Sequence, residues 1–240
     1  MANNLLAIVQ SAALEMGLPS PATVVGNPDG QTQQMLALAN REGRELAQIE
    51  GAWTALRGEQ DFTLVPGQAA YPFPNDFAYY LPDTFWDRSK TMPMSGPMSA
   101  VDWQVLKSGI FPAGVYTRYR IMNGQIFFNP TPASADTVAI EYVSSNWCQS
   151  STGVSQSAFL ADTDTPKLPD DLFTLGIKWR FLAVKGFNYS EEKDAYELAI
   201  SRLRPRDKVL EDINMGQRRD GAFLNMGILP FGNWPGRTSF

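Results

Sequence analysis

The spacing of hydrophobic residues changes twice along this chain, and that change limits the possible folds more than any other feature. Apolar residues recur at helical spacing in residues 1–58 and again in 168–215, whereas they alternate with a period of two in residues 59–148. This order predicts an α+β protein whose N- and C-terminal helix pairs form one discontinuous helical bundle, with an antiparallel β domain inserted between them. Residues 149–167 are rich in Ser, Thr and Asp and are expected to form a linker, and residues 216–240 an extended C-terminal arm.

Two helices are predicted near the N-terminus. The first covers residues 5–16 and is stopped by the Gly and Pro residues that follow it. The second is predicted from about Thr32 to Trp53, with apolar residues along one side. Arg41 and Glu45 are four residues apart on its polar side, so they are expected to form an ion pair.

The C-terminal helix pair contains the most apolar helix of the chain. Residues 169–186 leave only a narrow polar stripe, and Trp179 is expected to be a core residue, so this helix is predicted to lie at the centre of the bundle. Ser190 is predicted to cap the last helix, and Pro205 to kink or break it.

The central β region contains one strong hairpin pattern. Residues 115–121 and 125–129 flank the pair Asn123-Gly124, and both of these residues tolerate the positive φ of a type I′ turn. A further strand is predicted over residues 137–147, because its apolar residues alternate with polar ones.

A short helix is predicted within the β region, over residues 99–108. Val101, Val105 and Leu106 are expected to form its inward side.

The composition removes several classes of function. The chain has no histidine, which excludes nucleophiles activated by an imidazole and most transition-metal sites. Its formal net charge of −5 argues against a protein that grips nucleic acid, and the single Cys148 gives no internal disulfide. The sequence has no apolar run long enough to cross a membrane and no basic residue before Arg41, so we expect a protein assembled in the cytoplasm, without cofactor or metal.

An acidic cluster at Asp162, Asp164, Asp170 and Asp171 suggests a calcium loop but fails the spacing of an EF-hand. Counted from Asp162, the sixth and twelfth positions should be Gly and Glu; they are Lys and Phe. We interpret the cluster as a linker followed by the first turn of a helix, where carboxylates favour the positive end of the helix dipole.

Three carboxylates in the β region suggest a possible acid pair. Asp76, Asp83 and Asp87 lie among aromatic residues, as the catalytic acids of a glycosidase would. Acidic residues between strands are more often turn formers, and we favour that interpretation.

The end of the chain has large apolar residues but neither a helical nor a strand period. Such a segment cannot build its own core, yet its side chains are costly to leave in water, so they must dock on a surface. Two alternatives are open: the segment covers its own domain, or it is an arm that reaches a neighbour. The candidate partner-binding residues are Phe223, Leu224, Ile228, Leu229, Phe231, Trp234 and Phe240.

The order of short motifs resembles a known family, the head-to-tail adaptors of short-tailed double-stranded DNA phages, also called tail tubular protein A or tail accessory factor. The motifs cover most of the chain. They are Trp53 after the first helix pair, Phe62-Thr-Leu with Gly67 and Tyr71-Pro, Ile126-Phe-Phe-Asn-Pro-Thr-Pro132, Val138-Ala-Ile-Glu-Tyr142, and Lys167-Leu-Pro-Asp170 leading to Trp179 and Lys185-Gly186.

This resemblance implies a non-enzymatic structural protein of the virion, located in the tail or neck. Such adaptors form a homo-oligomeric ring, twelvefold in the family, that binds below the portal protein and connects it to the tail nozzle or tail fibres. Double-stranded DNA passes through the ring without specific binding, and no cofactor is implied. A net negative charge suits that role because it repels the phosphates of the DNA.

Two other functions are compatible with the sequence. A tail-associated hydrolase of peptidoglycan or polysaccharide would need a convergent acid pair in the aromatic-rich β region. A plain carbohydrate- or protein-binding β module would agree with the aromatic content but would give no role to the C-terminal segment.

Overall fold

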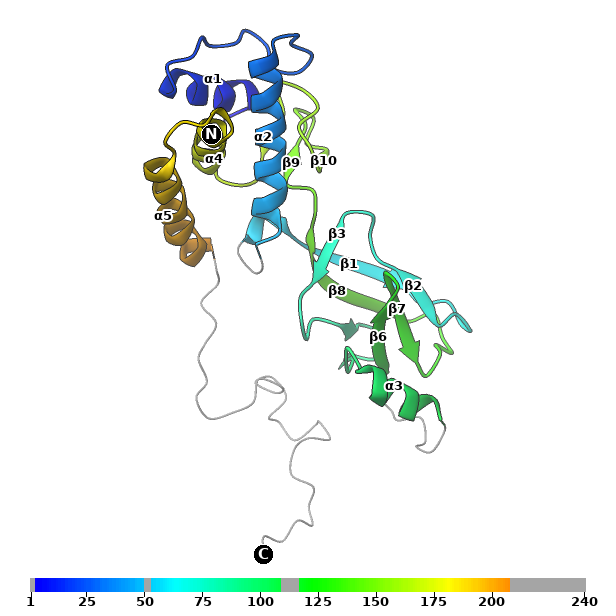
Figure 1. Cartoon of the computed structure of the whole chain (residues 1–240). Helices are drawn as coiled ribbons and strands as arrows, with labels where there is room; N and C mark the ends of the chain where they lie inside the picture. Colours follow the sequence, from blue (N-terminus) through cyan, green and yellow to red (C-terminus); the bar gives the residue numbers. More distant parts are fainter. Residues whose placement is uncertain (1–2, 50–52, 109–116, 208–240) are drawn as a thin grey trace, which may run out of the picture. The chain divides into compact units, whose positions relative to one another are not determined.

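The periodicity of the sequence corresponds to two kinds of structure in the computed structural model, which describes residues 3–49, 53–108 and 117–207 (Figure 1). The helices are α1 (Leu5–Glu15), α2 (Gly30–Ala47), α3 (Ala100–Lys107), α4 (Asp170–Lys185) and α5 (Ser190–Asp207), with a short 3-10 helix at Thr54–Leu56. The strands are β1 (Arg57–Thr63), β2 (Ala70–Pro72), β3 (Phe77–Tyr80), β4 (Trp86–Asp87), β5 (Met92–Pro93), β6 (Arg118–Met122), β7 (Gln125–Asn129), β8 (Thr137–Ser144), β9 (Cys148–Gln149), β10 (Ser155–Gln156) and β11 (Thr165–Pro166). All strand pairs are antiparallel apart from one isolated parallel bridge, so the predicted α+β class is confirmed.

The first two helices begin at side chains that cap free backbone amides. Asn4 accepts a hydrogen bond from the backbone N–H of Ala7 at 2.9 Å, and Asp29 accepts one from Thr32 at 2.9 Å. The Asp29 interaction lowers the pKa of its carboxyl, because the amide donor favours the charged form.

Helix α2 is shorter than its sequence pattern predicts. It ends at Ala47 rather than at Trp53, although Trp53 is still buried. The Trp53 indole N–H donates to the backbone carbonyl of Leu46 at 2.8 Å, and the same carbonyl accepts from the N–H of Ile49 at 3.2 Å at the helix end. The predicted ion pair on the polar side is confirmed, with Arg41 Nε at 2.6 Å from Glu45 Oε1.

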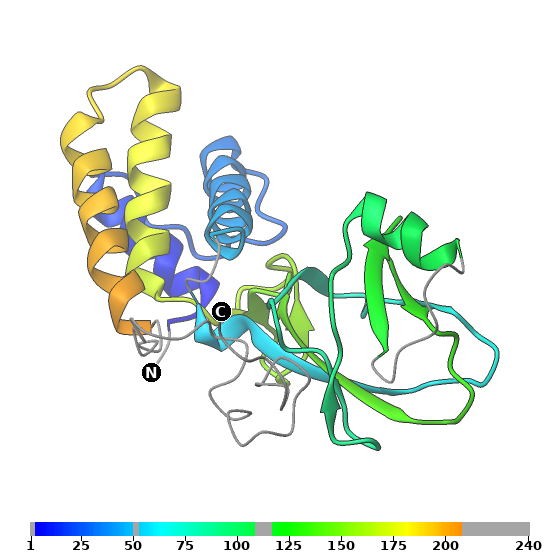
Figure 2. The same ribbon diagram turned by 90° about the horizontal axis from the view of Figure 1, so that it is seen from below.

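Helix α4 contacts α1, α2 and α5 and lies between α2 and α5 (Figure 2). Phe173 and Ile177 of α4 are fully buried in the helical core. The prediction for Trp179 is wrong, since its side chain is only partly buried, and Val184 is 64% exposed. Helix α4 is therefore apolar on a wider arc than its neighbours cover.

Helix α5 differs from its prediction at both ends. Ser190 is its first helical residue and does not cap it: the N–H of Lys193 donates to the backbone carbonyl of Tyr189 at 2.9 Å, and the Ser190 hydroxyl donates to the side chain of Asn188 at 2.8 Å. The helix also continues through Pro205 to Asp207 instead of breaking there. Among the α5 side chains that the structure describes, only Tyr196 is buried.

Strand β8 organises the largest sheet. It pairs with β1 along one edge and with β3 and β4 along the other, and β4 pairs in turn with β5. A second sheet has the order β2-β7-β6, and its β6–β7 hairpin turns at Asn123 (φ 53°) and Gly124 (φ 67°) as predicted. Residues 115 and 116 of the predicted hairpin lie outside the described residues.

The β sheets enclose their own hydrophobic core. Its buried members are Leu64, Tyr71, Phe85, Met94, Tyr119, Ile126, Phe128, Val138 and Ile140. Phe85 stacks on Tyr119 with ring centroids 4.0 Å apart. Burial raises the pKa of the Tyr119 hydroxyl, because the charged form loses its hydration.

Helix α3 forms where predicted but presents a different side inward. Val101 is 72% exposed and Val105 is 40% exposed, so their predicted inward position is wrong. Trp103 and Leu106 are buried instead, which is the i, i+3 spacing of one helix face. Leu106 was predicted correctly. The sequence pattern favoured the valines because two of them are four residues apart.

The segment expected to be a linker is more structured than that. It contains β10 and β11, which pair with β9 in a third sheet, and Phe159 within it is buried in the helical core. Val143, Trp147 and Cys148 also belong to that core, so the end of β8 leads directly into the helices. Burial raises the pKa of the Cys148 thiol to about 12 and leaves it unreactive.

Close packing of Trp147 against α2 generates a stability prediction. A Cβ atom at Gly43 would overlap the Trp147 ring, so Gly43→Ala should lower the free energy of unfolding by about 1–3 kcal/mol. Gly30→Ala is the matched control, because nothing lies near its Cβ position, and it should change stability by less than about 1 kcal/mol. Urea unfolding followed by circular dichroism measures both; equal stability of the two variants would contradict the packing.

Candidate functional site

Two of the three carboxylates of the β region, Asp76 and Asp87, lie too far apart to form an acid pair. Asp76 accepts hydrogen bonds from Ser144 Oγ at 2.6 Å and from the Tyr142 hydroxyl at 3.1 Å, near the end of β8. Asp87 pairs with Val138 near the beginning of the same strand. Six residues of strand separate the two positions, which corresponds to about 20 Å. The carboxyl groups of glycosidases are within about 5–10 Å of each other, so these two residues cannot act on one bond.

Each of these carboxylates also has a local structural role. Asp83 has φ 61° in the turn between β3 and β4, a left-handed conformation that aspartate tolerates better than most residues. Burial, together with the hydrogen bond that it donates to Asp76, raises the pKa of the Tyr142 hydroxyl. We find the turn-forming interpretation of the sequence supported by this geometry.

The acidic cluster near α4 binds backbone amides rather than a cation. The Asp162 carboxylate accepts from the N–H groups of Val24 and Val25, at 3.1 and 2.7 Å. Asp164 is 1% exposed and accepts from two amides of its own loop, at 2.7 and 2.8 Å. Asp170 accepts from the backbone N–H of Asn3 at 3.1 Å. Among the described residues, no group of three or more His, Cys, Asp or Glu side chains could hold a metal ion.

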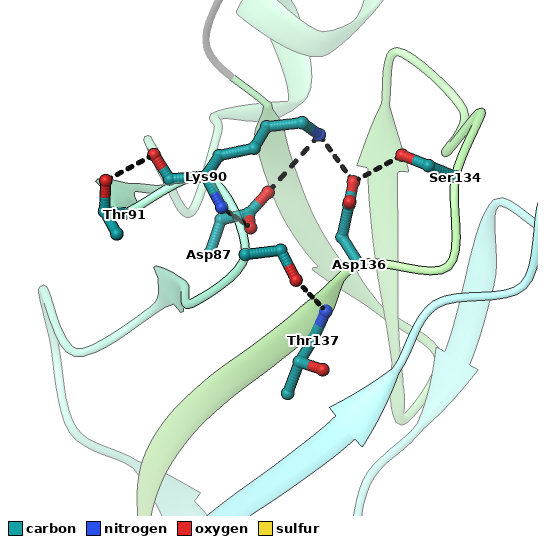
Figure 3. A network of polar contacts seen from close by, with 7 residues as sticks. Asp87, Lys90, Thr91, Ser134, Asp136 and Thr137 are labelled. Atoms are coloured by element: carbon teal, nitrogen blue, oxygen red, sulfur yellow. Dashed lines mark hydrogen bonds and ion pairs between the residues drawn. The ribbon is translucent and has the colours of Figure 1, made fainter.

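A polar network joins the β4–β5 hairpin to the loop before β8 (Figure 3). Lys90 Nζ lies 2.6 Å from Asp136 Oδ2 and 3.4 Å from Asp87 Oδ2. Ser134 donates to the same Asp136 oxygen at 2.8 Å, and the Thr137 N–H donates to the hydroxyl of Ser89 at 2.9 Å. This network uses the charges of two carboxylates and one ammonium to hold two loops together.

The Lys90 ammonium shifts the titration of its partner. Its hydrogen bond to Asp136 lowers the pKa of the Asp136 carboxyl, and the same bond raises the pKa of Lys90. Both shifts favour the charged pair.

A buried ion pair that the sequence pattern does not predict connects three helices. Arg180 of α4 is 4% exposed and pairs through Nη1 with Glu42 of α2, which is fully buried. Its Nη2 atom lies 2.6 Å from Glu45 Oε2, and the Tyr196 hydroxyl of α5 donates to Glu42 Oε1 at 2.5 Å. A Cβ atom at Gly176 would overlap the Glu42 carboxyl, so this glycine makes the space for the pair. Glu42 and Glu45, three residues apart on an amphipathic helix, have the pattern of surface residues. Only the arginine within the apolar pattern of α4 could have indicated a buried charge.

The surroundings of Arg180 are matched to its charge. Its guanidinium lies 4.8 Å from the ring of Trp179 and 5.9 Å from that of Tyr196, both within reach of a cation–π interaction. Burial lowers the pKa of Arg180 and raises the pKa of Tyr196, since both charged forms lose hydration. An arginine with a lowered pKa still carries its charge at neutral pH. The cluster is therefore an ionic contact that holds the helices together.

The exposed apolar residues of the described chain form candidate contact positions. At the α4–α5 turn, Val184 and Phe187 are 64% and 63% exposed and Tyr189 is 41% exposed. The seven partner-binding candidates predicted from the sequence, Phe223 to Phe240, all lie outside the described residues. Within the part of the chain that the structure describes, no helix is long and apolar enough to cross a membrane.

A comparison with protein families identifies the kind of protein that has this structure. The family described as SU10 adaptor protein matches residues 3–222. The chain belongs to the SU10 adaptor protein family. This confirms the resemblance to phage head-to-tail adaptors that the order of sequence motifs indicated. A search of curated proteins finds no match.

Membership in the SU10 adaptor protein family agrees with the roles that the carboxylates have in the structure. Adaptors of this kind are structural phage proteins, which agrees with carboxylates that are committed to backbone amides and loop contacts. The match ends at residue 222, immediately before the first of the predicted partner-binding residues, Phe223.

The buried ion pair makes a prediction about stability. Arg180→Met should cost about 3–5 kcal/mol, because it leaves the Glu42 charge buried without a partner. The double variant Glu42→Leu/Arg180→Met removes both charges and should recover most of that loss. Arg41→Met is the control, since its pair with Glu45 is exposed and should contribute about 0–1 kcal/mol. Chemical unfolding measures all three, and a double variant no more stable than Arg180→Met would contradict the proposed pairing.

The Lys90–Asp136 pair predicts a pH dependence. Because the pKa of Asp136 is lowered in the folded state, the pair contributes stability above the unfolded pKa of about 4 and loses it as the pH falls through the lowered value. Asp136→Asn should therefore be less stable than the original at pH 7, and the difference should vanish near pH 2. Melting temperatures across this range test it, with Asp61→Asn on the exposed surface of β1 as the control. A difference that is constant with pH would refute the electrostatic cause.

Proposed function

We propose that the protein is a head-to-tail adaptor that forms a ring below the portal protein and connects it to the tail nozzle or fibres. The observation that carries this proposal is the SU10 adaptor family match, which spans residues 3–222 of the 240 in the chain. In this role the protein is a virion component of the tail or neck, assembled in the host cytoplasm. Copies of the chain would form the ring, twelve by analogy with the head-to-tail adaptors it resembles.

The charge of the chain supports a role in the DNA ejection conduit. A net charge of −5 opposes tight binding of phosphates, so double-stranded DNA would pass without being held.

We propose the following division of the chain for this function. Residues 1–58 and 168–215 form one discontinuous helical bundle, and residues 59–148 form the inserted β domain. The contacts of α4 with α1, α2 and α5 support the bundle, as does the separate core of the β sheets. The backbone N–H of Leu5 also donates to the carbonyl of Asp164 at 2.8 Å, which ties the first helix to the segment that leads into α4.

The C-terminal residues 216–240 are proposed as the arm that docks on the portal or on a neighbouring subunit. Ordering such a segment costs roughly 1–2 kcal/mol per residue, and only burial of large side chains offsets that cost. Phe223, Phe231 and Trp234 are the aromatic residues suited to act as anchors.

Deletion of residues 217–240 tests the proposed function. The truncated chain should keep its melting temperature and lose attachment to portal-bearing heads, because the lost contacts are intermolecular. The measurement is co-sedimentation of the protein with purified heads, beside differential scanning calorimetry of the free protein.

A full-length Phe231→Ser/Trp234→Ser variant separates loss of the anchors from loss of chain length, and it should also fail to attach. Normal attachment of the truncated chain would refute the arm, and its unfolding would show that the segment covers its own core. Release of soluble fragments from peptidoglycan by the full-length protein would instead favour the hydrolase alternative.

A further inference from the structure

Helix α5 separates its charges by sign along its length. Its first half contains four carboxylates and one lysine: Glu191, Glu192, Asp194, Glu197 and Lys193. Its second half contains three arginines and one carboxylate: Arg202, Arg204, Arg206 and Asp207. The helix therefore has an acidic half followed by a basic half.

The acidic half points its charges into solvent. Glu191, Asp194 and Glu197 recur every third residue and are exposed, whereas Tyr196 faces the buried Glu42. Glu192 is different, since it lies toward α4 and pairs with Lys178 at 3.0 Å. The described part of the chain contains no ion pair to Glu191 or Asp194, and Glu197 has only an exposed contact with Lys193 at 3.4 Å.

Beyond these carboxylates, the outward face of α5 contains a leucine and an arginine. Leu198 is near the middle of the helix and 48% exposed, and Arg202, one turn further on, is also exposed. An exposed leucine between an acidic and a basic stretch offers apolar contact at the point where the charge changes sign.

Stability of α5 itself does not explain this separation. The helix dipole favours carboxylates in the first turn and cations in the last, and its effect fades within one turn. Asp194, Glu197 and Arg202 lie outside those end turns. Like charges three or four residues apart, such as Glu191 and Asp194, destabilise a helix, whereas alternating signs would stabilise it. The arrangement thus costs helix stability, and the exposed Glu191, Asp194 and Arg202 are accessible to another molecule.

We propose that α5 binds α5 of a second copy of this chain, with the acidic half of one against the basic half of the other. A second copy is favoured over DNA because the same helix carries both a cationic stretch and an anionic stretch that matches it. The contact uses different halves on the two copies, so it can also repeat from copy to copy around a ring. This inference rests on the proposed function. It names the contact between neighbouring subunits of the ring and not the contact with the portal.

A charge swap in the full-length protein tests this contact. Variant A is Asp194→Lys/Glu197→Lys, which makes most of α5 basic, and variant B is Arg202→Glu/Arg204→Glu, which makes it acidic. For each variant alone, the dissociation constant for self-association should rise on the order of tenfold or more above that of the original chain, since attraction becomes repulsion. An equimolar mixture of A and B should restore association, because every acidic α5 then meets a basic one. Sedimentation velocity at about 0.05 and 0.5 M salt measures it, and high salt should weaken the original contact.

The control is Asp61→Lys/Glu141→Lys, which changes the net charge as variant A does but on exposed positions of β1 and β8. It should associate like the original chain. Circular dichroism checks that α5 stays folded, and Asp194→Asn/Glu197→Gln replaces variant A if it does not.

Three outcomes overturn the α5 contact. The first is an original chain that stays monomeric at all concentrations, and the second is a mixture of A and B that fails to restore association. The third is a variant B that loses binding to a DNA duplex but keeps its self-association. Attachment to portal-bearing heads is measured separately for variants A and B. Normal attachment with failed charge rescue rejects this contact alone, and absence of attachment by the original chain rejects the proposed function.

Discussion

The packing of Trp147 connects the two kinds of structure in this protein. The residue follows the last strand of the large sheet, yet its ring is fully buried among the helices, 5.5 Å from Phe173 and 4.8 Å from Phe159 between ring centroids. Gly43 of α2 provides the surface on which the indole lies. Because interiors are close-packed, a ring of this size fixes the positions of α2, α4 and the loop around Phe159 together. The chain that leaves the β core is thereby tied to the helical core within a few residues of β8.

Carboxylates in this protein mainly complete the backbone of loops. Asp162 and Asp164 accept five hydrogen bonds from backbone amides between them, and Asp29 starts α2 in the same way. Buried amides without partners are costly, so long connections in a folded chain need such acceptors. The carboxylates of Asp29, Asp162 and Asp164 are thus engaged in holding the backbone of helix ends and loops.

The sequence predicted the elements whose cause is local and missed those whose cause is tertiary. The Asn123-Gly124 turn and the helical period of α4 are local, and both formed as expected. The strands after Cys148 are only two residues long, which is too short to show an alternating pattern, so no period could reveal them. The burial of Glu42 depends on Arg180, which is 138 residues further along the chain. The inward side of α3 likewise depends on what it packs against, and its valines form an equally regular but exposed stripe.

Apolar packing alone defines the orientation of α4 poorly, because this helix has apolar side chains on most of its circumference, including the exposed Val184. Burial of apolar side chains therefore distinguishes rotations about its axis less sharply than it would for a helix with a single apolar stripe. Arg180 distinguishes between them, since any rotation that separates it from Glu42 leaves a charge buried without a partner, at a cost of several kcal/mol. Gly176 adds a steric condition, because the Glu42 carboxyl fits only where a side chain is absent. Tyr196 then extends the same condition to α5 through its hydrogen bond to Glu42. We infer that the ion pair selects one rotation of α4 and, through it, the face of α5 that is turned outward with its separated charges.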